Sequence, residues 1–119
     1  MGIYLDSNKT TELHRTCGAV HGFADALSES LFRNEADHDR DCQLFCGLET
    51  VRGMCSCIFW MVYFNDESSH YVAQLMMKWS HIREMFSGEY SCEFNILKMA
   101  RVLVKAASDT IVESECEKA

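Results

Sequence analysis

Residues 44–64 read LFCGLETVRGMCSCIFWMVYF, and this stretch decides the fold of the chain. Its aliphatic residues recur at alternating steps of four and three, which places them on one side of an α-helix. The residues on this side are Leu44, Leu48, Val51, Cys55, Ile58 and Val62. Between Met54 and Phe64 only Ser56 is plainly polar. The spacing predicts one long apolar helix, which we place at residues 37–64.

The opposite side of this predicted helix is apolar as well. A helix that is apolar all round must be covered on all sides. It is either the central helix of a monomer, or a helix that a second copy or another protein covers from outside. Because aromatic residues with a polar end are enriched at interface hot spots, we favour the second arrangement, with a homodimer as its commonest form. The predicted partner or dimer interface consists of Gly53, Cys57, Trp60, Tyr63 and Phe64.

Three further segments carry the narrow apolar stripe of an amphipathic helix. We place these helices at residues 11–33, 69–86 and 90–113. Consecutive helices with short connections pack antiparallel. The sequence therefore predicts an all-α fold, a small antiparallel bundle of about four helices. The bundle forms a single domain over residues 1–119, with residues 1–9 and 114–119 as loose ends.

Composition and charge narrow the classes of function. The formal net charge of −7 disfavours direct binding to the phosphates of nucleic acid. The first residues lack the basic region and the long apolar run of a signal peptide, so the seven cysteines are expected to be reduced. No uninterrupted apolar run reaches the roughly 18 residues that a membrane helix needs. We expect a cytoplasmic protein that does not bind a membrane.

One face of the predicted second helix suggests an alternative function. His38, Cys42 and Cys46 are spaced four residues apart, so they lie along one side of a helix. An imidazole and two thiolates could bind a metal ion if a fourth ligand came from elsewhere, which would make the protein a metal or redox sensor. Structural zinc sites, however, usually hold their cysteine pairs in tight turns. We therefore expect no cofactor and keep the sensor as the alternative.

The chain also lacks the common signatures of catalysis. It contains no Gly-x-Ser-x-Gly nucleophile motif and no glycine-rich loop for phosphate. The remaining class is a non-enzymatic regulatory module that acts through protein–protein interaction. Such a module needs only an apolar face that competes with the partner's own assembly.

The segment GLETVRGMCSCIFW at residues 47–60, together with the size and the helical pattern, resembles small bacterial quorum-sensing anti-activators of the QslA type. The resemblance is one of general character and contains no diagnostic motif, so it assigns no role to a single residue. It implies a helical homodimer that binds a LuxR-type transcription factor. Binding would block dimerisation of that factor, and with it DNA binding.

Overall fold

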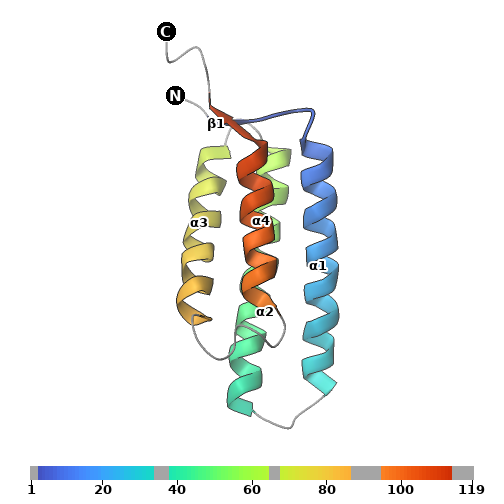
Figure 1. Cartoon of the computed structure of the whole chain (residues 1–119). Coiled ribbons are helices and arrows are strands. Elements are labelled where there is room, and N and C mark those ends of the chain that lie inside the picture. Colours follow the sequence, from blue (N-terminus) through green and yellow to red (C-terminus); the bar gives the residue numbers. More distant parts are fainter. Residues whose placement is uncertain (1–2, 34–37, 65–67, 87–94, 114–119) are drawn as a thin grey trace.

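The computed structural model describes residues 3–33, 38–64, 68–86 and 95–113, with side chains described at residues 5–31, 43–64, 69–86 and 95–111. Its helices are α1 (Thr10–Arg33), α2 (His38–Tyr63), α3 (Ser68–Met85) and α4 (Ile96–Thr110). Successive helices run in opposite directions (Figure 1). The predicted all-α antiparallel bundle of four helices is confirmed.

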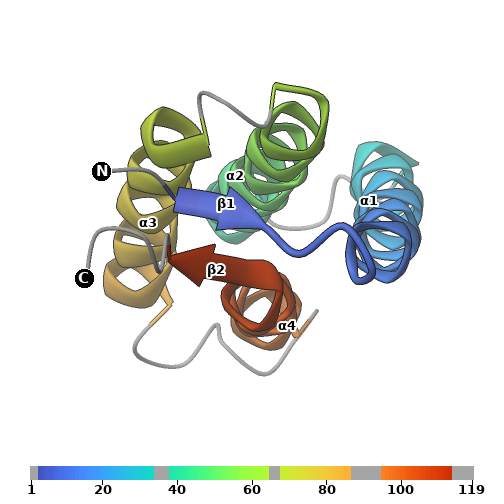
Figure 2. The same ribbon diagram turned by 90° about the horizontal axis from the view of Figure 1, so that it is seen from above.

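Helix α2 occupies the central position in this bundle. It packs most extensively on α1 and α3, and also on α4. Seen along the helices, α1 and α3 lie on either side of α2, and α4 closes the bundle opposite it (Figure 2). No helix of the described chain covers the side of α2 that is turned away from α4. This arrangement leaves one strip of the most apolar helix facing outward.

The core is built on the apolar stripes of the four helices, and Met54, Cys57 and Met61 join it from outside the predicted stripe of α2. Every residue of the α2 stripe from Leu44 to Ile58 is fully buried, and the stripes of α1 and α4 contribute Leu13, Cys17, Ala24, Ile96, Ala100, Leu103 and Ala107. Helix α3 contributes Leu75 and Ile82, with Phe86 directly after its end. Helical spacing also predicts Met76 on the inner stripe of α3, and this prediction is wrong, since Met76 is 43% exposed.

The segment Gln43–Tyr63 of α2 is long and apolar enough to cross a membrane, judged by length and composition alone. The sequence analysis did not single it out because Glu49 and Arg52 interrupt the apolar run. In the structure this segment is the core helix of a compact bundle, with three helices packed on it. A core helix of this kind is consistent with a soluble protein.

Two short strands join the ends of the domain. Strand β1 (Ile3–Leu5) pairs antiparallel with β2 (Ile111–Glu113), with Leu5 opposite Ile111. Residues 3–5 are therefore a strand instead of part of a loose end, and α4 ends at Thr110 instead of reaching Glu113, while residues 1 and 2 lie outside the described residues. Ile111 and Val112 are β-branched and favour extended backbone, and Leu5 gains a buried position by pairing with them. The expected loose end at 114–119 and the expected helix at 90–94 lie outside the described residues.

Candidate functional site

Three aromatic side chains are exposed together at the C-terminal end of α2. Trp60 is 47% exposed, Tyr63 76% and Phe64 37%. The rings of Trp60 and Phe64 are stacked with their centroids 5.2 Å apart, and the Tyr63 ring meets the Phe64 ring edge-on at 4.8 Å. The three rings therefore support one another in a fixed arrangement. We call them the aromatic surface.

The aromatic surface forms part of an open apolar hollow between α1 and α2. Phe59 and Val62 of α2 and His14 of α1 complete its lining, and its volume is about 740 Å³. The His14 ring lies 5.0 Å from the Phe59 ring, centroid to centroid. Concave apolar surfaces with a few polar groups at the edge are typical binding sites. The hollow is thus shaped to receive an apolar side chain from outside.

The exposed residues of α2 form a single line that leads to the aromatic surface. Among the described side chains of α2 they are Cys46, Glu49, Ser56, Trp60 and Tyr63. Their spacing of three, seven, four and three residues keeps them on one side of the helix, with half-buried Gly53 on the same line. We call this line, Gly53 included, the α2 strip. It is the side of α2 that α1, α3 and α4 leave uncovered.

Of the predicted interface residues, Cys57 lies against α3 instead of facing outward, and Gly53 of the α2 strip is covered in part by a side chain of α3. Cys57 is only 4% exposed, and its Sγ lies 4.0 Å from Oε1 of Gln74 in α3. A Cβ atom placed on Gly53 would lie 3.4 Å from Cε and Nζ of Lys78. The prediction of Cys57 as an interface residue is corrected by its burial, and Lys78 partly covers Gly53. The structure leaves Trp60, Tyr63 and Phe64 open to a partner.

Charged groups near the α2 strip are paired with one another, with one exception. Nε of Arg52 lies 2.7 Å from Oδ1 of Asp25 in α1, and the same guanidinium binds Glu49. Asp25 also accepts from Nδ1 of His21 at 3.1 Å. The pair of Arg52 and Asp25 ties α1 to α2 along the edge of the strip. Lys78 differs, because no carboxylate of the described chain lies within ion-pair distance of its ammonium group.

Cys17 and Cys55 meet in the core between α1 and α2. The Cys17 thiol donates to the carbonyl oxygen of Cys55 at 3.3 Å, and the Cys55 thiol donates to that of Cys17 at 3.6 Å. Hydrogen bonding with Cys55 and burial hold the pKa of Cys17 far above its ordinary value of 9.0. Burial also raises the pKa of Cys57, although nearby Lys78 opposes the rise. A raised pKa keeps the thiols of Cys17 and Cys57 protonated at neutral pH.

Thiol labelling should separate these cysteines clearly. The reactive species is the thiolate, and Cys17, Cys55 and Cys57 are buried while Cys46 is exposed. At pH 8, N-ethylmaleimide should modify Cys46 at least about 100-fold faster than the other three, which react only when the bundle opens. Peptide mass mapping over time measures the four rates. Equal rates in the native protein would contradict the packing of α1 on α2, and in urea the rates should converge.

The described residues do not bring metal-binding side chains together. Among them, no three His, Cys, Asp or Glu side chains are grouped closely enough to hold a metal ion. Cys46 of the predicted metal-binding face is exposed on the α2 strip. The side chains of His38 and Cys42 lie outside the described residues, so a metal site on this face stays an untested alternative.

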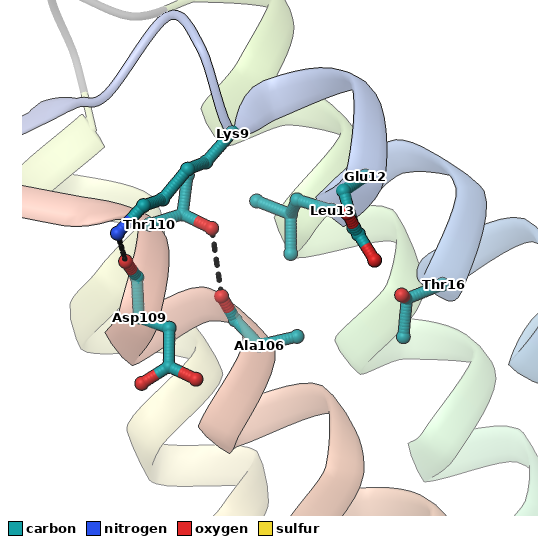
Figure 3. Close-up of a pocket in the computed structure, with 7 residues that line it drawn as sticks. All are labelled: Lys9, Glu12, Leu13, Thr16, Ala106, Asp109 and Thr110. Carbon is teal, nitrogen blue, oxygen red and sulfur yellow. Dashed lines mark hydrogen bonds between the residues drawn. The ribbon is translucent and has the colours of Figure 1, made fainter.

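A second hollow lies between α1 and α4 (Figure 3). Nζ of Lys9 donates to the backbone oxygen of Asp109 at 3.3 Å, and Oγ1 of Thr110 donates to that of Ala106 at 2.8 Å. The Lys9 contact joins the start of α1 to the end of α4, whereas the Thr110 hydrogen bond lies within α4.

Fold and site together define a class: a small all-α four-helix bundle that carries an exposed aromatic surface on its central helix. Comparison of the chain with protein-family models, with curated proteins and with solved structures found no match. The aromatic surface is therefore the feature that bears most directly on function.

Proposed function

We propose that this protein is a non-enzymatic regulatory module that binds a partner protein through the aromatic surface. The observation that carries the proposal is the exposure of Trp60, Tyr63 and Phe64 side by side at the end of an otherwise buried helix. Adjacent exposed aromatic rings are unusual on a monomer and mark interaction sites. Trp and Tyr are also the residues that most often dominate binding energy. Stacking of the Trp60 ring on the Phe64 ring restricts both side chains before binding, which lowers the entropy that binding costs.

The partner we propose is a transcription factor of the LuxR type, held in the cytoplasm in a form that cannot dimerise. The resemblance of residues 47–60 to anti-activators of the QslA type supports this choice of partner. The net charge of −7 supports an indirect mode of action, because an acidic protein is repelled by DNA phosphates. A module of this kind would act by covering the apolar surface through which the factor dimerises.

The substitution Trp60→Asp tests whether the aromatic surface binds a partner. We expect the variant to capture the partner from an extract of the native host at least about 30-fold more weakly, the loss typical of a hot-spot residue. Val102→Asp is the matched control, since Val102 is a similarly exposed apolar residue on α4, at 41%. Quantitative mass spectrometry of the captured proteins gives the comparison. Equal capture by wild type and Trp60→Asp would rule out the proposal.

A gel-shift assay tests separately whether the protein acts as an anti-activator. Wild-type protein added to a LuxR-type activator of the same host should release that activator from its DNA site in a gel-shift assay. Trp60→Asp should leave the activator bound, whereas Val102→Asp should act like wild type. If capture depends on Trp60 but DNA binding is unaffected, the surface binds a partner of another class.

A further inference from the structure

Cys17 of α1 and Cys55 of α2 form a pair of thiols in the centre of the bundle. Both residues are fully buried. Sγ of Cys17 lies 3.3 Å from the backbone oxygen of Cys55, and Sγ of Cys55 lies 3.6 Å from that of Cys17. The Cys17 thiol also forms a hydrogen bond with the Cys55 side chain. Each thiol therefore reaches across the contact between the helices, although the two residues are 38 positions apart in the sequence.

The fold selects this pair among the cysteines whose side chains are described. Cys46 is exposed on the α2 strip, and Sγ of Cys57 lies 4.0 Å from Oε1 of Gln74 in α3. Cys55 and Cys57 are two residues apart in one helix, so their side chains point in nearly opposite directions and cannot join. Cys17 and Cys55 are thus the two thiols that the packing of α1 on α2 brings together.

We propose that this pair is a reversible oxidation site, at which a disulfide between Cys17 and Cys55 locks α1 onto α2. The oxidant is a low-molecular-weight disulfide such as oxidised glutathione. One protein thiol loses its proton and attacks it, which forms a mixed disulfide and releases one reduced glutathione. The second protein thiol then loses its proton and displaces the other glutathione, which closes the S–S bond. Two protein thiols are oxidised, and one glutathione disulfide is reduced to two thiols.

Burial makes this oxidation slow. Hydrogen bonding with Cys55 and burial raise the pKa of Cys17, and the attacking species is the thiolate. The first step therefore needs a transient separation of α1 from α2. A brief exposure to the oxidant would modify exposed Cys46 and leave the buried pair reduced. Once the link is closed, the same packing protects it from reductants, so the site responds to lasting oxidation.

The pair lies directly beside the apolar hollow. His14 precedes Cys17 by three residues, and Phe59 follows Cys55 by four, so each is one helical turn away. The rings of His14 and Phe59 line the hollow 5.0 Å apart, on the adjacent helices α1 and α2 (Figure 2). A covalent link would therefore fix the two walls of the hollow against each other. The oxidation site goes beyond the proposed binding function and does not depend on it.

An equilibrium with glutathione tests whether the folded bundle favours the link. The test chain keeps only Cys17 and Cys55 of its seven cysteines, with alanine at the others. It is incubated with equal concentrations of reduced and oxidised glutathione, in buffer and in concentrated urea, starting from both the reduced and the linked form. The ratio of linked to unlinked chain should be at least about tenfold higher in the folded protein, because the fold holds the thiols together.

A chain that keeps only Cys17 and Cys57 is the matched control, since the Cys57 thiol lies against α3. Its ratio of linked to unlinked chain should not rise on folding. A ratio for Cys17 and Cys55 that is no higher in the folded chain than in urea overturns the inference. Helical circular dichroism should show that both chains are folded in buffer.

Wild type provides the same test without substitutions. After long exposure to oxidised glutathione, peptide mass mapping should find Cys17 linked to Cys55, and dithiothreitol should remove the link. Cys57→Ala should keep the link and Cys55→Ala should abolish it. The linked protein should unfold at a midpoint at least about 5 °C above that of the reduced protein. A link from Cys17 to Cys57, or a linked protein that unfolds at a lower temperature, would show that the fold does not accommodate this disulfide.

Discussion

Replacing Phe86 with alanine should lower the free energy of unfolding by about 4 kcal/mol. Phe86 is fully buried directly after α3, and its ring packs against Gly47 of α2. The backbone N–H of Phe86 donates a hydrogen bond to the backbone oxygen of Ile82 at 2.9 Å. This bond continues the last turn of α3 and holds the ring at this position. Removal of the ring leaves a cavity between α2, α3 and α4 that the rigid helices fill only in part. The loss is a large share of the stability of a domain of this size.

Urea unfolding followed by circular dichroism measures this loss. Phe23→Ala is the matched control, because the Phe23 ring is 56% exposed on α1 and its removal opens no cavity. We expect the control to change the free energy of unfolding by less than about 1 kcal/mol. Similar losses for the two variants would contradict the burial of Phe86 at the meeting point of three helices.

A single added methyl group at Gly47 should destabilise the bundle by about 2 kcal/mol. A Cβ placed there would overlap Cε2 and Cζ of Phe86 and would lie 3.1 Å from Cδ1 of Ile96. Alanine raises helix propensity by about 1 kcal/mol, so the clash must exceed this gain. Because the Phe86 ring is rigid and enclosed, the helices themselves have to move apart. Gly47 is thus the point that sets the distance between α2 and the end of α3.

Gly18→Ala and Gly22→Ala on the outer side of α1 are the matched controls for this prediction. An added Cβ at either position meets nothing within 4 Å. These variants should therefore stabilise the protein by up to about 1 kcal/mol through helix propensity alone. The double variant Gly47→Ala with Phe86→Leu should lose less stability than the two single variants lose together. The reason is that the smaller leucine side chain leaves room for the added methyl group. Stabilisation by Gly47→Ala alone would show that the Phe86 ring does not lie on this glycine.

The candidate site was predictable in part. The helical wheel of residues 44–64 separates the stripe ending at Val62 from the side that carries Trp60, and the structure leaves Trp60, Tyr63 and Phe64 exposed. Cys57 belongs to the same side of the wheel but is buried by α3. A wheel assigns a direction to each side chain, and it does not indicate how far around the helix a neighbour reaches. In α3, Gln74 reaches Cys57 and Lys78 reaches Gly53. The sequence of α2 alone does not predict these two contacts.

The same reasoning applies to the ends of the domain. Ile3, Tyr4 and Leu5 have no helical or alternating pattern long enough to predict an element. They form a strand because the end of α4 brings Ile111 and Val112 beside them, more than a hundred residues further along the chain. The backbone hydrogen bond from the N–H of Asp6 to the oxygen of Thr110 at 2.8 Å ties this end of the chain to the end of α4. Pairing of this kind depends on contacts that are distant in sequence.

Periodicity by itself determined that this protein is a bundle of helices, because each helix buries the residues that recur at its own repeat. It also determined that residues 44–64 carry more apolar surface than one stripe requires. Only the tertiary structure decided which part of that surface stays open, since covering depends on where α1 and α3 meet α2. The distance between neighbouring helices is set by contacts such as Gly47 with Phe86 and Cys17 with Cys55. The two residues of each contact are far apart in the sequence.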